Sequence, residues 1–262
     1  DQPVSALQDI RQQEAFHAWM RSKDYTASLM MRVINTGKAA INRAHKRGEL
    51  TTAPHVMSVP VGSTNPKGRP LTVDELRLVY GNAVPHIQAF MRWAVGTGAR
   101  PEAILELQAR QIDWEQGLVD LNPPGRKQQP KKYRPVVRLP EALRQPFEGY
   151  AVAYQGQRVQ SVKKGLWRAC DRAGVERCSS YSFRHTAARW MRREGVPPWE
   201  VAAQLGHSVG SKFAVSERYA AYSPDYLQNA VLALNKLVLA AEYLPNTCQK
   251  LVPQEGFEPP TP

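Results

Sequence analysis

The chain has 262 residues, of which 35 are Lys or Arg and 23 are Asp or Glu, so its net charge is +12 at neutral pH. Its 42% of hydrophobic and 22% of charged residues are typical of a folded protein and argue against a disordered one. The sequence contains no apolar window long enough to span a membrane, no secretory leader and no C-x-x-C pair among its three cysteines. These features favour a basic protein of a reducing cytosol with a polyanionic partner.

The first part of the chain predicts two helices and a linker. Apolar residues recur at helical spacing between residues 5 and 23 and again after residue 26, where Gly48 closes a basic helix end. Residues 51–70 contain four prolines and two glycines without periodicity, which predicts a linker. The parts on its two sides are both basic, with net charges of +3 for residues 1–66 and +9 for residues 67–262.

The second part opens on a helix start. Thr72 and Glu75 have the spacing of a capping box, which predicts a helix that ends near Gly81. A further helix is expected over residues 86–95, and Pro101 suits the first position of another.

A small sheet follows these helices. Residues 112–114 and 118–121 predict a hairpin, and residues 133–139 predict a third strand. From residue 141 to about residue 243 we expect only helices. The predicted fold class is mainly α with one small antiparallel β-sheet.

Four stretches contain residues suited to phosphate chemistry. The first is G-T-G-A-R-P-E, in which Arg100 lies at a helix N-terminus that favours an anion. The second holds six basic residues and no acid between Arg126 and Arg138, a pattern that favours phosphate contact over a solvated turn. In the third, Tyr181 and Arg184 are three residues apart, which places both side chains on one face of a helix. The fourth contains His207 in L-G-H-S, followed by E-R-Y-A-A-Y. Tyrosines near a helix usually pack against other residues and hydrogen-bond through their hydroxyl groups.

The order of these motifs resembles the tyrosine recombinases, the phage integrase family. The resemblance covers about residues 70–225, and more loosely residues 1–66. It implies a helical, SAM-like core-binding DNA-binding domain at 1–66, which we interpret as truncated at its N-terminus because the chain begins with Asp. It further implies a catalytic domain at 67–245, which leaves 246–262 as a disordered tail.

The resemblance also implies the chemistry. Members cut and rejoin DNA strands through a 3′-phosphotyrosine without metal, nucleotide or other cofactor. By analogy Tyr219 is the nucleophile, Arg100 and Arg184 bind the non-bridging phosphate oxygens, and His207 binds the phosphate or relays a proton. A lysine of the basic stretch, Lys131 in preference to Lys127 or Lys132, protonates the leaving 5′-oxygen.

Further DNA contacts are expected from the basic stretch. Its candidate DNA-binding residues are Arg126, Lys127, Lys132 and Arg134.

The sequence departs from the family pattern at two positions. Tyr181 stands where the family usually has His, and because a phenol is a poor base near neutral pH we expect only a supporting role for it. The 12 residues from His207 to Tyr219 exceed the usual spacing, and Tyr222 is a rival nucleophile. Two alternatives therefore stay open, a DNA-binding protein of this fold that does not cleave and a type IB topoisomerase.

The expected partners are double-stranded DNA attachment sites, three further protomers in a homotetramer on DNA, and accessory DNA-bending or directionality proteins. A helix over residues 225–244 with an apolar stripe is our candidate for the link between protomers, although such a stripe usually packs in its own core. The resemblance places the protein in the bacterial cytosol or nucleoid.

Overall fold

The computed structural model describes residues 4–59, 68–129, 132–207 and 223–242. The chain forms two compact units, Asp1–Pro66 and Lys67–Pro262. The expected tail at 246–262 lies outside the described residues.

The first unit consists of the 3-10 helix η1 (Val4–Gln8) and the helices α1 (Ile10–Ser22) and α2 (Ala27–Lys46). The single helix expected from residue 5 is interrupted, because the Asp9 carboxylate accepts a hydrogen bond from the Arg11 backbone N–H at 2.9 Å and starts α1 there. Thr26 caps α2 in the same manner.

The core of the first unit is small and includes part of the expected linker. Its buried apolar residues are Met20, Met30, Ile34 and Val59. The buried Gln13 side chain donates to the His55 carbonyl at 2.8 Å and accepts from the Met57 backbone N–H at 2.7 Å. The chain up to Val59 therefore packs on the two helices, and composition alone had assigned these residues to a linker.

The second unit is built mainly of helices around one large apolar core. The helices are α3 (Val73–Gly81), α4 (Pro85–Thr97), α5 (Pro101–Leu105), α6 (Lys163–Ala173), α7 (Ser180–Arg193), α8 (Pro198–Gln204) and α10 (Gln228–Glu242), with short 3-10 turns η2 (Ala109–Gln111), η4 (Glu141–Leu143) and η6 (Pro224–Tyr226). The capping box is confirmed, since the Thr72 backbone N–H donates to Glu75 at 2.8 Å and the Glu75 N–H donates to Thr72 Oγ1 at 3.1 Å.

A three-stranded antiparallel sheet lies at one side of the second unit. Its strands β1 (Ile112–Asp113), β2 (Leu118–Asp120) and β3 (Val136–Arg138) pair in the order β1-β2-β3. Val119 pairs with Val137 across β2 and β3, and both side chains are fully buried. This agrees with the predicted fold class.

The expectation of only helices after residue 141 is wrong. A second hairpin, β4 (Ala153–Tyr154) and β5 (Gln157–Arg158), lies between η4 and α6. Its two-residue turn places Gln155 and Gly156 at positive φ, the geometry of a type I′ turn that matches the twist of the strands.

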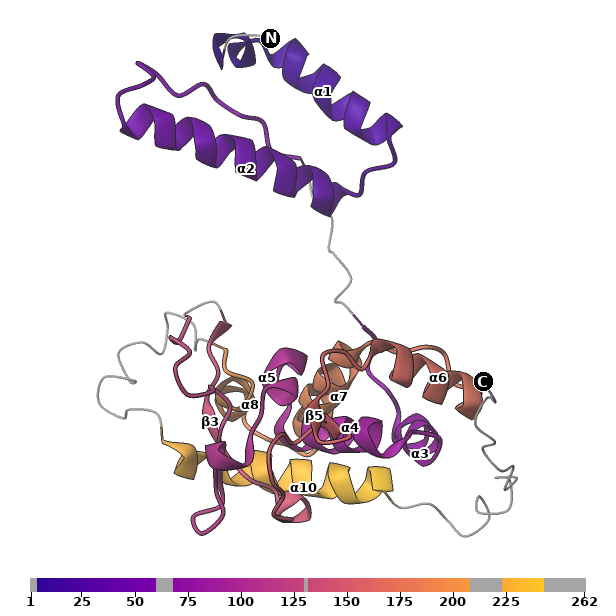
Figure 1. The fold of residues 1–262 in the computed structure, drawn as a ribbon. Helices are drawn as coiled ribbons and strands as arrows, with labels where there is room; N and C mark the ends of the chain where they lie inside the picture. Colours follow the sequence, from indigo (N-terminus) through magenta and orange to yellow (C-terminus); the bar gives the residue numbers. More distant parts are fainter. Residues whose placement is uncertain (1–3, 60–67, 130–131, 208–222, 243–262) are drawn as a thin grey trace, which may run out of the picture. The chain divides into compact units, whose positions relative to one another are not determined.

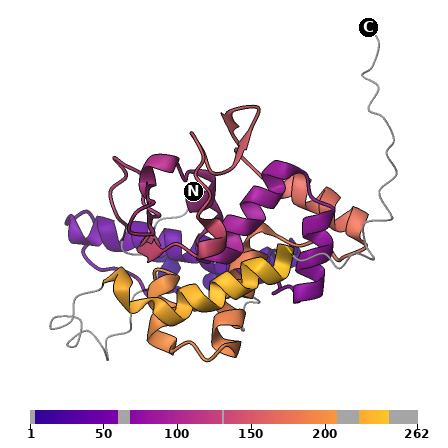
Figure 2. The same ribbon diagram turned by 90° about the horizontal axis from the view of Figure 1, so that it is seen from below.

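Helix α10 runs along one side of the second unit (Figures 1 and 2) and packs against α3, α4 and α7. Its buried residues are Ala230, Ala233, Leu234, Leu237, Val238 and Ala241. The apolar stripe that was our candidate for a contact between protomers is therefore buried within its own unit.

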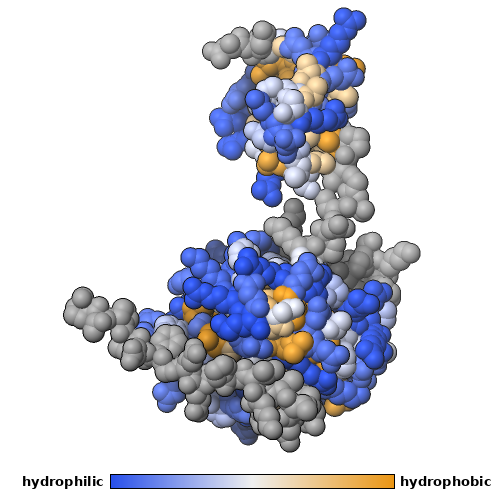
Figure 3. Space-filling model, turned by 90° about the vertical axis from the view of Figure 1, so that its right-hand side faces the viewer, coloured by the Kyte–Doolittle hydropathy of each residue, from blue (hydrophilic) through white to orange (hydrophobic). Residues whose placement is uncertain are grey.

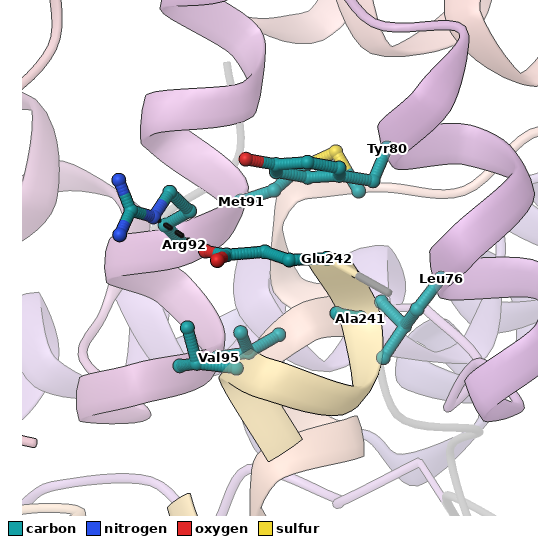
Figure 4. A pocket seen from close by; sticks show the side chains of 8 residues that line it. Leu76, Tyr80, Met91, Arg92, Val95, Ala241 and Glu242 are labelled. Carbon is teal, nitrogen blue, oxygen red and sulfur yellow. Dashed lines mark ion pairs between the residues drawn. The ribbon is translucent and has the colours of Figure 1, made fainter. Parts of the chain in front are cut away.

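The C-terminal end of α10 is fixed by an ion pair (Figure 4). Arg92 Nε lies 2.5 Å from a Glu242 carboxylate oxygen, next to the ring of Tyr80. Burial and the Glu242 charge raise the pKa of Tyr80. The residual space there is about 10 Å³, which is enough for one water at most, so this is a packed joint and not a ligand site.

The surfaces of both units are mainly hydrophilic on the face drawn in Figure 3, with small apolar patches between the polar side chains. None of the described helices combines the length and the apolarity needed to cross a membrane.

Candidate anion-binding active site

Arg100 lies at the turn between α4 and α5. Gly98 ends α4 with φ +63°, a left-handed conformation that favours glycine, and Pro101 begins α5 directly after Arg100. The Arg100 guanidinium donates from Nη1 to the Tyr133 carbonyl at 2.7 Å. This bond connects the turn to the chain between β2 and β3.

Arg184 lies on α7 and is buried. It donates from Nη1 to the Gly98 carbonyl at 2.7 Å and from Nη2 to the Leu205 carbonyl at 2.6 Å, and the same Nη2 lies 3.0 Å from His207 Nε2. Burial, and then the charge of Arg100, lower the pKa of Arg184 to about 10. The group therefore keeps its charge at neutral pH, while three groups from two other segments, Gly98 and residues 205–207, hold it in place.

His207 follows α8 after a turn that needs glycine. Gly206 has φ +63°, and a Cβ there would lie 2.7 Å from both the Tyr133 carbonyl oxygen and Pro135 Cδ. Burial, followed by the charges of Arg184 and Arg100, holds the pKa of His207 below its usual value. The imidazole is therefore neutral at neutral pH and can accept the Arg184 hydrogen bond at Nε2. We call Arg100, Arg184 and His207 the arginine centre.

Tyr181 lies on α7 one turn before Arg184, as its spacing predicts. Burial, and then the charge of Glu102, raise its pKa, so the phenol stays protonated at neutral pH. A protonated phenol donates a hydrogen bond and does not act as a base, which fits the supporting role expected from the sequence. Sequence reasoning did not identify Glu102 as its neighbour, although the residue lies in the R-P-E motif.

The basic stretch connects β2 to β3, and we call residues 126–134 the basic loop. Lys127 and Lys132 are exposed. Arg126 is anchored, with Nη1 donating to Asn122 Oδ1 at 2.5 Å and Nη2 to the Lys132 carbonyl at 3.3 Å.

Arg134 differs from the other basic-loop residues. It is buried, and its Nη1 lies 2.7 Å from a carboxylate oxygen of Glu106, which also pairs with Arg158 at 3.3 Å. The basic stretch contains no acid, but the fold supplies one from the residues that follow α5. The geometry thus gives Arg134 a structural partner in place of a free phosphate-binding face.

Two of the candidate catalytic residues, Lys131 and Tyr219, lie outside the described residues, as does the rival Tyr222. The other four candidates, Arg100, Tyr181, Arg184 and His207, lie close together among the described residues. The charges of the two arginines lower the pKa of both His207 and Tyr181, although burial raises that of Tyr181 overall.

The arginine centre is suited to bind an oxyanion. Within the described part of the chain no carboxylate forms an ion pair with Arg100 or Arg184, so backbone carbonyls orient both cations without neutralising them. Sequence reasoning missed the carbonyl groups of Gly98, Tyr133 and Leu205, because a backbone acceptor has no sequence signal. Among the same described residues no group of three or more His, Cys, Asp or Glu side chains could hold a metal ion.

Comparison with solved structures shows the same fold. The chain superposes on the Tn1549 transposon integrase in complex with transposon right-end DNA with a TM-score of 0.63 at 16% identity, over 88% of this chain and 86% of the other. A lambda integrase dimer bound to a core site gives 0.58 at 17% identity, over 77% and 80%. A lambda integrase tetramer bound to a Holliday junction gives 0.58 at 17% identity, over 77% and 62%.

A search of curated proteins finds no significant match. The model of the phage integrase family matches residues 70–223, which is more than half of the chain and contains every residue of the arginine centre. The chain therefore belongs to the phage integrase family, the site-specific tyrosine recombinases, which are enzymes that exchange DNA strands.

Proposed function

We propose that the arginine centre binds the scissile phosphate of a DNA attachment site and that Tyr219 attacks it. The observation that carries this proposal is the position of Arg184, which three hydrogen-bonding groups hold beside Arg100 with no carboxylate of the described residues paired to it. A guanidinium has five N–H donors and keeps its charge, so it can bind non-bridging oxygens and stabilise the charge that grows in the pentavalent transition state.

The reaction balances without an external energy source. The Tyr219 oxygen forms a bond to phosphorus, the bond from phosphorus to the 5′-oxygen breaks, and Lys131 donates a proton to that oxygen. The product is a 3′-phosphotyrosine, which keeps the energy of the original phosphodiester. A 5′-hydroxyl of another strand then attacks the phosphotyrosine, and Tyr219 leaves.

The remaining residues of the site assist in this step. Neutral His207, whose Nε2 accepts from Arg184, is suited to bind the phosphate through its other ring N–H; to take the proton of Tyr219 at Nε2 it must give up the Arg184 bond. Tyr181 donates a hydrogen bond. Lys127, Lys132 and Arg126 contact the DNA backbone, and Arg134 supports the loop that carries them.

The solved relatives support a proposal for the substrate and the assembly. The lambda and Tn1549 integrases are described in complex with DNA, and the lambda enzyme as a tetramer on a Holliday junction. We propose that this chain likewise acts as a homotetramer on double-stranded attachment sites, where its first unit is a second DNA-binding domain. Accessory DNA-bending or directionality proteins complete the assembly in the bacterial nucleoid.

A covalent-trapping assay tests the proposal. A nicked duplex from the DNA that flanks the coding sequence loses a short fragment after cleavage, so the protein stays attached to the DNA. Wild type and Tyr222→Phe should form the adduct, and Tyr219→Phe should not. If Tyr219→Phe still forms it, or if no protein forms it while DNA is bound, the assignment of Tyr219 or of cleavage itself is wrong.

A further inference from the structure

A fully buried carboxylate lies outside the proposed mechanism. Glu200 on α8 has no exposed surface. One of its oxygens accepts the Ala230 backbone N–H at 2.7 Å and the other accepts Asn229 Nδ2 at 3.1 Å. Both donors belong to the first turn of α10, where the helix dipole also favours a negative charge. A buried carboxylate needs hydrogen-bond donors of this kind for both of its oxygens.

The position of Glu200 along the chain connects it to the reaction. Helix α8 leads directly into Leu205 and His207, and α10 begins nine residues after Tyr219. In the sequence, the two helices therefore precede and follow the stretch that carries Tyr219. Before this stretch, Arg184 binds the Leu205 carbonyl. After it, Glu200 binds the first turn of α10.

A second carboxylate contact lies just before the start of α10. Asp225 in η6 lies 2.5 Å from Arg138 Nη2 on β3, and Ser223 donates to the same carboxylate at 3.2 Å. Asp225 is largely exposed, however, and an exposed pair contributes little. The buried Glu200 is the stronger anchor of the two.

We propose that Glu200 is a positioning residue for the nucleophile. By holding the first turn of α10 on α8, it fixes the end of the chain that carries Tyr219 relative to Arg184 and His207. Its hydrogen bonds among the described residues go to Asn229 and Ala230 and not to the arginine centre, so its effect on the reaction is through the placement of Tyr219. This inference rests on the proposed function of Tyr219 as the nucleophile.

The test compares two matched changes in the 262-residue chain. Glu200→Gln keeps the shape, removes the charge at the first turn of α10 and turns one acceptor into a donor, which Asn229 can meet only by turning its amide over to present Oδ1. Glu194→Gln removes a different carboxylate bond to α10, the 2.8 Å contact with Lys236 in the middle of that helix. The measurements are the single-turnover rate of adduct formation at saturating protein, the Kd for DNA and the thermal unfolding curve.

We expect Glu200→Gln to cleave about 10–100-fold more slowly, since a misplacement of about 1 Å can cost 100-fold in rate. Its Kd should stay within about twofold of wild type, since phosphate contacts dominate affinity. Glu194→Gln should match wild type in both. Asn229→Ala removes only the hydrogen bond between the exposed Asn229 side chain and Glu200, so it should show a smaller loss of rate with an unchanged Kd. If Glu200→Gln does not fold, Asn229→Ala replaces it in the test.

Two further measurements separate positioning from a general loss of structure. The double variant Glu200→Gln/Asn229→Asp reverses donor and acceptor between the two side chains and should recover most of the lost rate. A DNA with sulfur in place of the bridging 5′-oxygen needs no proton for its leaving group but still needs the attack, so Glu200→Gln should remain slow on it.

The proposal is overturned by any of three results. These are a wild-type rate for the variant that carries the test, a loss of rate no larger than its loss of folded protein, or full recovery on the sulfur substrate. A failure of the proposed function is a different result, in which wild type forms no adduct through Tyr219.

Discussion

The arginine centre and the basic loop hold charges of the same sign in opposite ways. Arg184 is buried and bound to carbonyls from two other segments, whereas Lys127 and Lys132 are exposed and extend into solvent. The buried cation is oriented before DNA arrives, so its charge can serve the transition state. The exposed cations are screened by salt, and we expect them to contribute mainly to binding. The following variants should separate these two uses of positive charge.

The largest effect is expected for Arg184→Lys. A lysine keeps the charge but cannot reach the Gly98 and Leu205 carbonyls with a planar fork. The rate of adduct formation should fall by about 10²–10³-fold, as on removal of one transition-state donor. The Kd for DNA should change far less. A weaker Kd with an unchanged rate at saturating protein would show that Arg184 serves binding only.

Arg134→Met should lower the stability of the protein without weakening its binding to DNA. The change leaves Glu106 with Arg158 alone, and because Glu106 is 30% exposed we expect a loss of about 1–2 kcal/mol in the free energy of unfolding. Urea unfolding measures it, with Lys132→Met as the control. A drop in the salt dependence of DNA binding would instead place Arg134 on phosphate.

A pH effect is expected from His207. In the free protein, burial and the two arginines keep its pKa low, and a bound phosphate brings negative charge that raises it. The complex then binds more protons than the free protein, so affinity should rise by a few-fold as the pH falls from about 7 to 5.5. His207→Gln should remove this dependence. The Kd measured across that pH range, at constant salt, decides the outcome.

The smallest effect is expected for Lys127→Ala and Lys132→Ala. Each should weaken DNA binding a few-fold and lower the slope of log K against log salt by about 1, with little change in the cleavage rate at saturation. The contrast with Arg184→Lys then measures what burial adds to a positive charge. A cleavage defect as large as that of Arg184→Lys would remove the distinction.

The sequence predicted local structure well where a local rule decides it. The capping box at Thr72, the start of α5 at Pro101 and the strand pair around Val119 depend on residues close in the chain. The hairpin at Gln155 and Gly156 was missed because a Gln-Gly turn is a weaker signal than Asn-Gly. The packing of residues 53–59 on the first unit depends on Gln13, which lies more than forty residues earlier.

For the site, the sequence by itself identified the residue types and the family. The order of the motifs that contain arginine, histidine and tyrosine carried the resemblance to the family, and these side chains suit phosphoryl transfer without a metal. Only the tertiary structure decided how they are used. It put Arg184 on the Gly98 and Leu205 carbonyls, paired Arg134 with Glu106, and placed Glu200 under the first turn of α10. These contacts join segments far apart in the chain through backbone acceptors and buried charges, which no local pattern encodes.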